Sequence, residues 1–129
     1  ETGEFVICDK TREKANEVKS VEVIGEVKNK DVIIVDDLID TGGTIAMASN
    51  VIMDKGAKSV RAIITHPVLS GNAEENLENS SLIELVVTDS IPLNIRNKKI
   101  KVLSIAGLFA KAIRKIHENE STSSLFINR

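Results

Sequence analysis

The sequence predicts an α/β domain with a mainly parallel central sheet flanked by helices. Short runs of β-branched and other apolar residues alternate with helical patterns along the 129 residues. Strands that alternate with helices favour parallel pairing through crossover helices. The length suits one domain with a core of its own. Neither an internal repeat nor a low-complexity segment interrupts the pattern.

Strands are expected where short apolar runs stand between turn residues. Val32 to Val35 are consecutively apolar, which predicts a central strand buried on both faces. The other runs are β-branched or alternate with polar residues, as is typical of strands. The predicted strands are residues 4–8, 21–24, 31–36, 59–65, 83–88 and 100–105.

Helices are expected in three places. Residues 43–55 are predicted to form a helix that ends at Gly56, because apolar residues recur on one side of it. Residues 71–78 indicate a short polar helix or turn, and residues 107–118 an amphipathic helix. The apolar positions of the first helix are Ile45, Ala48, Val51 and Ile52, and those of the last are Leu108, Phe109, Ala112, Ile113 and Ile116.

The segment 36–44, Asp-Asp-Leu-Ile-Asp-Thr-Gly-Gly-Thr, is the most informative part of the chain. It places two adjacent carboxylates at the end of an apolar strand and a tight glycine turn at the start of a helix. Backbone N–H groups of such a turn, with the positive end of the helix, form a site for a phosphate. The neighbouring acids suit sugar hydroxyls or a metal ion. The segment therefore predicts a site for a sugar phosphate.

The glycine turn differs from two common nucleotide-binding turns. A nucleoside-triphosphate P-loop needs a Lys after its last Gly, where this chain has Thr44. A dinucleotide fingerprint needs Gly-x-Gly-x-x-Gly, which this segment lacks. A purely structural helix cap remains an alternative on these residues alone. In a parallel sheet the loop at 65–71, which follows the next strand, is expected to lie beside this turn. The two loops would then form one wall of a pocket.

The turn resembles the ribose-phosphate-binding signature of the phosphoribosyltransferase fold. Five further segments, at 9–12, 56–62, 65–71, 84–93 and 118–126, together with it resemble the C-terminal half of the ribose-phosphate diphosphokinase family. The resemblance runs in order over nearly the whole chain. It implies a partial, C-terminal phosphoribosyltransferase-like domain (1–129) of a two-domain enzyme, apparently truncated at its N-terminus.

The resemblance implies diphosphoryl transfer from ATP to the 1-hydroxyl of ribose 5-phosphate, with Mg²⁺ as cofactor and AMP as a product. Most of the ATP site is expected outside this chain, so the fragment is expected to be inactive alone. No metal ligand is assigned with certainty within it. The residues implied to bind ribose 5-phosphate are Asp36, Asp37, Asp40, Thr41, Gly42, Gly43 and Thr44.

Lys10 and Arg12 match the family's catalytic Lys-x-Arg pair, in a segment, 9–19, that is predicted to be a flexible loop. Two cations in a mobile segment can cover the transferring diphosphate and neutralise the charge of the transition state. The alternative is an ordinary solvated run of charges, since acidic residues flank the pair.

The tail at 119–129 is expected to be polar and mobile, and two functions of it stay open. Ser121, Thr122 and Ser123 resemble the family's regulatory site for phosphate or ADP, or else belong to a disordered tail.

His66 and His117 are expected to have structural roles, and His117 is expected to interact favourably with a helix C-terminus. Cys8 is expected to be a small buried apolar residue.

Composition limits the partners. The 17 basic and 19 acidic residues nearly balance, which does not favour nucleic-acid or membrane surfaces. Three Phe and no Trp or Tyr leave little for base stacking. No apolar run is long enough to span a bilayer, and no signal peptide is seen. We expect a cytoplasmic protein whose parent is a homo-oligomer, by resemblance one in which dimers assemble into a hexamer.

Three hypotheses remain. The first is the catalytic synthetase, favoured by Lys10, Arg12 and the glycine turn. The second is a non-catalytic regulatory homologue, which would not need Asp36 and Asp37. The third is a phosphoribosyltransferase, which would share the turn but should carry an aromatic or hood segment for a base.

Overall fold

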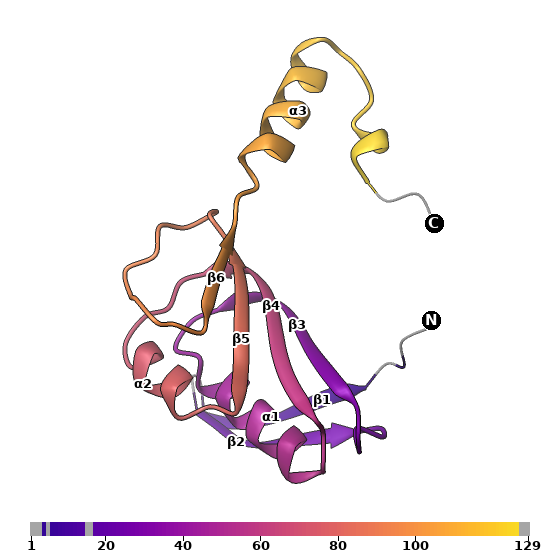
Figure 1. Ribbon diagram of the computed structural model, residues 1–129. Helices are drawn as coiled ribbons and strands as arrows, with labels where there is room; N and C mark the ends of the chain where they lie inside the picture. The colour runs from indigo at the N-terminus through magenta and orange to yellow at the C-terminus, as the bar shows by residue number, and fades with distance from the viewer. Residues whose placement is uncertain (1–3, 5, 15–16, 127–129) are drawn as a thin grey trace.

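A four-stranded parallel sheet and a two-stranded antiparallel hairpin form the β structure of the computed structural model (Figure 1). The structure describes residues 4, 6–14 and 17–126. The parallel α/β architecture predicted from the sequence is confirmed. The elements in chain order are β1 (Ile7–Lys14), β2 (Glu17–Ile24), β3 (Asp31–Ile39), α1 (Gly43–Asp54), β4 (Ser59–Pro67), α2 (Ala73–Glu78), β5 (Leu82–Thr88), β6 (Ile100–Leu103), α3 (Ala106–His117) and a 3₁₀ turn, Ser123–Leu125.

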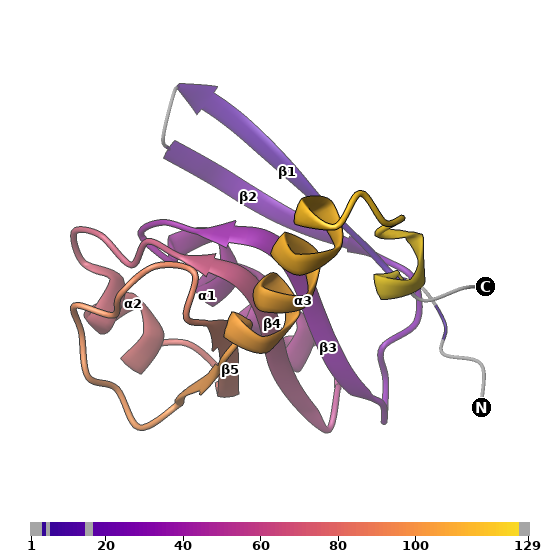
Figure 2. The same ribbon diagram turned by 90° about the horizontal axis from the view of Figure 1, so that it is seen from above.

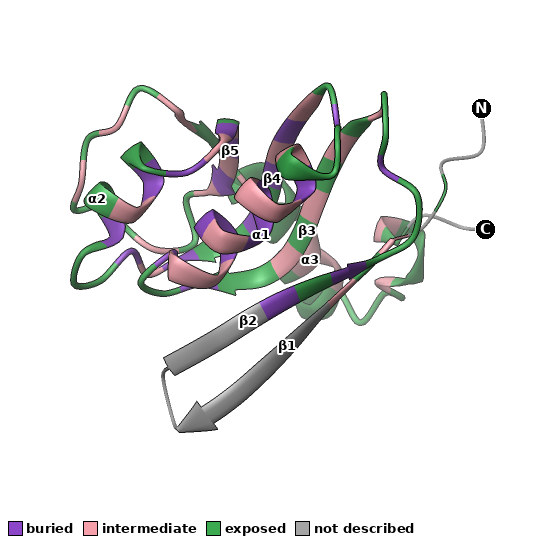
Figure 3. Ribbon diagram, turned by 90° about the horizontal axis from the view of Figure 1, so that it is seen from below, coloured by how far each residue is buried: buried purple, intermediate pink, exposed green. Residues whose placement is uncertain are grey.

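The order of the parallel sheet, β3-β4-β5-β6, decides which of its faces is covered. Each strand is added on the same side of the one before it. Because crossovers between parallel strands are right-handed, strands added in one direction place their connecting helices on the same face. Figures 2 and 3 show α1 and α2 together on one face of the sheet. Among the described residues, the opposite face stays largely open.

The core lies between the sheet and these two helices. Alternate residues of β4, namely Val60, Ala62 and Ile64, are at most 1% exposed, as the pleat requires of a half-covered sheet. Ile52 of α1 and Leu77 of α2 are buried to the same degree. The predicted burial of the first helix is confirmed at Ile45, Ala48 and Ile52, while Val51 is half-buried.

The prediction that the strand at 31–36 is central and buried on both faces is wrong. β3 is an edge strand of the described sheet, and Ile33 and Val35 are 55% and 75% exposed. Val32 and Ile34 pack against the core instead. The reason is the single direction of strand addition, which leaves one face without a covering helix. β3 is also longer than predicted, so that Asp36 and Asp37 lie inside the strand.

The two N-terminal strands are longer than predicted and pair with each other. β1 and β2 form an antiparallel hairpin in which Lys10 pairs with Val21, with register shifts on either side of Arg12. The segment 9–19, predicted to be a flexible loop, is therefore mostly strand, apart from residues 15–16, which lie outside the described residues. The hairpin lies beside α1, where Lys55 Nζ donates to the carbonyl oxygen of Val23 at 2.6 Å.

The last helix, α3, forms close to its predicted position but is not packed against the sheet. None of its residues is buried. Figure 1 shows it standing clear of the sheet beyond the carboxyl end of β6. Its exposed apolar residues are Leu108, Phe109, Ile113 and Ile116.

Candidate functional site

A tight turn joins β3 to α1, and Gly42 determines its shape. Gly42 has φ = 75°, the left-handed region that favours glycine, and it stands at the N-cap of α1. The residue is buried, and an added Cβ would lie 3.6 Å from Ile39 Cδ1. A side chain at this position would strain the backbone but would not clash severely with its neighbours.

The N-terminus of α1 presents backbone donors to the turn. The bond from Ala46 N to Gly42 O, 2.9 Å long, is the first turn of the helix. The N–H groups of Gly43, Thr44 and Ile45 precede it and have no intrahelical acceptor. Within the described part of the chain, no side chain caps this terminus. These N–H groups without an intrahelical acceptor and the helix dipole together favour an anion at this position.

Three acids precede these amides in the chain, two near the end of β3 and one in the turn. Asp36 is half-buried, whereas Asp37 and Asp40 are exposed. The pleat of β3 places Asp36 on the face of Val32 and Ile34 and Asp37 on the opposite face. Asp36 Oδ1 also accepts the backbone N–H of Asp37 at 3.0 Å. The two adjacent carboxylates are thus set in different directions.

The loop after β4 lies beside the turn, as expected for residues 65–71, although residues 65–67 belong to β4 itself. The N–H groups of Val68 and Leu69 donate to Ile39 O at 3.0 and 3.2 Å. Ser70 N donates to Asp40 O at 3.1 Å, and the Ser70 hydroxyl donates to the Asp40 carboxylate. Asp40 is therefore held on both its backbone and its side chain.

Asn76 of α2 is a residue of the site that the sequence did not single out. Its Nδ2 donates to the carbonyl oxygen of Thr41 at 2.7 Å. An asparagine in a short polar helix carries no signal of such a role, because only the fold brings α2 beside the turn.

His66 lies in β4, where it pairs with Leu38 of β3. Its Nδ1 lies 3.0 Å from the Ser90 hydroxyl, which in turn donates to Thr65 O at 3.1 Å. Thr88 Oγ1 donates to the same carbonyl at 2.7 Å. These contacts join the ends of β4 and β5, which agrees with a structural role for this histidine.

The other predicted site residues lie in different parts of the chain. Lys10 and Arg12 lie in β1, and the structure describes their backbone but not their side chains. In the tail, the hydroxyls of Ser121 and Ser123 lie 2.8 Å apart, and Ser123 N donates to Ser121 Oγ. Figure 1 shows this tail beyond α3, away from the sheet. Cys8 is half-buried and packs against the core.

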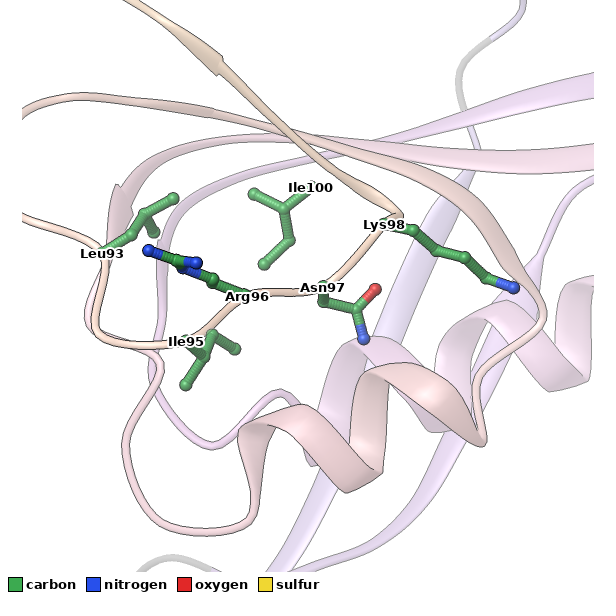
Figure 4. Close-up of a pocket in the computed structure, with 6 residues that line it drawn as sticks. All are labelled: Leu93, Ile95, Arg96, Asn97, Lys98 and Ile100. Carbon is green, nitrogen blue, oxygen red and sulfur yellow. The ribbon is translucent and has the colours of Figure 1, made fainter.

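A shallow hollow of about 360 Å³ lies in the connection between β5 and β6 and shares no residue with the glycine turn. Figure 4 shows the Arg96 side chain lying among Leu93, Ile95 and Ile100, while Lys98 points the other way. Across the described residues, no group of three or more His, Cys, Asp or Glu side chains could hold a metal ion. The helices of the same residues are too short or too polar to cross a membrane.

Fold and site together define the class. The chain is a parallel α/β domain. Its glycine turn, with backbone N–H groups that have no intrahelical acceptor, lies at the carboxyl end of a strand, which is where such sheets bind ligands. It belongs to the phosphoribosyl synthetase-associated domain family, whose model matches residues 7–127.

Individual relatives agree with this family. The chain is 54% identical over 124 residues to a ribose-phosphate pyrophosphokinase of Wolinella succinogenes, covering 96% of this chain and 40% of the relative. A protein of the same name from Campylobacter jejuni is 55% identical over 124 residues, with the same coverage. The crystal structure of phosphoribosylpyrophosphate synthetase from Mycobacterium smegmatis matches with a TM-score of 0.74 and 44% identity, over 80% of this chain and 35% of that one. The chain thus spans about 40% of the length of these curated relatives.

Proposed function

We propose that this chain is the ribose-phosphate-binding part of a ribose-phosphate diphosphokinase. The complete protein transfers diphosphate from ATP to the 1-hydroxyl of ribose 5-phosphate, giving 5-phosphoribosyl 1-diphosphate and AMP. The observation that supports this most is the left-handed Gly42 turn at the N-terminus of α1, which three acids precede in the chain. More than half of the residues are identical to those of proteins named ribose-phosphate pyrophosphokinase. These names favour a synthetase over a phosphoribosyltransferase.

In this proposal the 5-phosphate binds the amides of the turn. The N–H groups of Thr41 to Thr44 and the two threonine hydroxyls are the donors. Asp36, Asp37 and Asp40 accept hydrogen bonds from the ribose hydroxyls. Holding the sugar at both ends fixes the 1-hydroxyl in line with the β-phosphorus of ATP, and positioning of this kind supplies much of the catalysis in phosphoryl transfer.

Mg²⁺ fits this donor set as an ion shared with the substrates. Magnesium is usually held by one or two carboxylates together with substrate oxygens. The described residues offer carboxylates next to the turn but no three-ligand cluster. Asp36 and Asp37 are the candidate ligands on this chain. The ion would neutralise phosphate charge.

Lys10 and Arg12 supply the remaining charge in this proposal, from the hairpin. Removing either is expected to lower the rate of AMP formation by the complete protein by about 10²–10³-fold. We also propose a cytoplasmic homo-oligomer, a hexamer built of dimers, whose ATP site is largely outside this chain. In it, Ser121, Thr122 and Ser123 contribute to a regulatory site for phosphate or ADP.

The test is a titration of the isotopically labelled chain with ribose 5-phosphate and Mg²⁺. Saturable shifts are expected at the amides of Thr41 to Thr44, and they should be competed by 5-phosphoribosyl 1-diphosphate. Asp37→Asn should weaken binding. The matched control is Asp54→Asn, which removes an exposed carboxylate at the far end of α1. A folded chain whose turn amides do not respond would contradict the proposed site.

A further inference from the structure

We propose that Asn76 is a positioning residue that fixes the direction of the Gly42 amide in the anion-binding turn. The inference rests on the proposed function, since it concerns how the same turn is prepared for a phosphate. Asn76 does not touch the ligand. It acts through the peptide between Thr41 and Gly42.

The first argument is the contact itself. Asn76 Nδ2 lies 2.7 Å from the carbonyl oxygen of Thr41. A carbonyl oxygen only accepts hydrogen bonds, so the amide group of Asn76 must present its NH₂. The contact joins residues 35 positions apart, α2 to the turn before α1.

The donor is held in place by its helix. Ala73 and Leu77, on either side of Asn76 along α2, are completely buried. The Asn76 backbone N–H donates to Asn72 O at 2.9 Å. Because α2 is anchored in the core at both positions, the Asn76 side chain reaches the turn from a fixed base.

The planarity of the peptide carries the effect to the site. In a trans peptide the C=O and the following N–H point in opposite directions. No peptide bond in the described chain is cis. Holding the Thr41 carbonyl toward α2 therefore aims the Gly42 N–H away from α2. A flip of this peptide would turn the carbonyl outward, where it would repel a phosphate.

Both glycines of the turn lie within contact distance of Asn76. A Cβ added to Gly42 would lie 3.9 Å from Asn76 Cβ, and one added to Gly43 would lie 3.7 Å from its Nδ2. The asparagine thus lies directly against both glycines. Gly42 supplies the left-handed backbone, and Asn76 selects one of the two orientations that this flexible backbone allows.

The test compares three variants of the labelled chain. Asn76→Ala removes one neutral hydrogen bond, so the affinity for ribose 5-phosphate with Mg²⁺ should fall about three- to ten-fold. Asn76→Asp keeps the shape but faces the Thr41 carbonyl with a carboxylate, so its loss should be larger. Asn79→Ala, at the exposed C-cap of the same helix, is the control and should bind like the unchanged chain.

A second readout needs no ligand. In both Asn76 variants the carbonyl carbon of Thr41 and the amide nitrogen of Gly42 should change their chemical shifts, while the signals of β4 and β5 stay in place. Unchanged shifts at these two nuclei would overturn the inference, even if the sugar phosphate did not bind at all. If the unchanged chain binds and Asn76→Ala binds equally well, the inference fails and the proposed function stands. If the unchanged chain does not bind, the proposed function fails, and the ligand-free spectra still decide the role of Asn76.

Discussion

The Asp89 carboxylate accepts a hydrogen bond from the backbone N–H of Ile105, with 2.9 Å between Oδ1 and N. Asp89 directly follows β5, and Ile105 is the N-cap residue of α3. No side chain of α3 is buried, so this bond helps to fix where the helix begins. A carboxylate at this end of a helix is also favoured by the helix dipole.

The bond predicts an acid transition at the start of α3. A hydrogen bond from the Ser104 side chain, and secondly that from Ile105 N–H, holds the pKa of Asp89 below its ordinary value of 3.8. A depressed pKa stabilises the folded state above the ordinary value, and this stabilisation is lost as the pH falls through the folded pKa. The amide proton of Ile105, followed by NMR, should therefore shift with a midpoint below 3.8. Asp89→Ala should abolish this step; an unaltered step would assign it to another group.

Replacing Gly42 by alanine should destabilise the fold. At φ = 75° an L-residue is strained, so Gly42→Ala should lower the free energy of unfolding by about 1–2 kcal/mol. Gly107→Ala is the control, because nothing lies within 4 Å of its added Cβ and α3 is unpacked. The control should not lose stability, since alanine is favoured over glycine in a helix by up to about 1 kcal/mol. Urea denaturation measures both, and equal effects would show that the turn tolerates a side chain.

Lys99 should matter for stability through α2. Its Nζ donates to the carbonyl oxygens of Leu77, in the last turn of that helix, and of Ser80, just beyond it, at 2.6 and 2.9 Å. Burial, and secondly repulsion from Lys98, lowers the pKa of Lys99. Lys99→Met leaves these partly buried carbonyls without this donor, which should cost about 1–3 kcal/mol.

Lys98→Met is the matched control for Lys99→Met. Lys98 is exposed and adjacent in sequence, so its replacement should change the free energy of unfolding by less than about 0.5 kcal/mol. Denaturation of the two variants side by side separates the contact from the charge. A Lys98 variant as unstable as the Lys99 variant would mean that net charge, not the contact with α2, explains the loss.

The sequence predicted the local pattern of helices and strands well, but it predicted poorly which elements pack against each other. Alternation in β4 and the helical spacing of Ile45, Ala48 and Ile52 depend on short-range periodicity, which the chain carries in itself. The apolar run of β3 predicted burial on both faces, yet Val35 is exposed, because burial depends on which element covers each face. Periodicity alone does not contain that information.

The residues of the candidate site also fall into those that the sequence predicted and those that it did not. The Asp36–Thr44 segment was recognisable because its residue types and spacing carry the chemistry. The loop at 65–71, which carries Ser70, was also expected beside the turn, because it follows the next strand of a parallel sheet. Asn76 was not recognisable as a support of the turn, because only the fold brings α2 beside it. The long hairpin was missed because the charged segment 9–19 lacks the apolar alternation by which strands are recognised.

The open sheet face and α3 predict that the 129-residue chain associates with itself as its concentration rises. Val35 and Ile113 are 75% and 64% exposed, each among further exposed apolar residues of its own element. Apolar patches of this kind favour association, because contact removes them from water. Sedimentation velocity over a range of concentrations should show a shift from monomer toward larger species.

Single charges should locate the surface responsible. Val35→Lys places a charge on the open sheet face, and Ile113→Lys places one on α3, so whichever face is in contact should lose association. Asn79→Lys adds the same charge at the exposed C-cap of α2 and should leave association unchanged. If all three variants weaken association equally, net charge explains the effect. If the unchanged chain stays monomeric at all concentrations, these apolar faces are too small or too dispersed to hold two copies together.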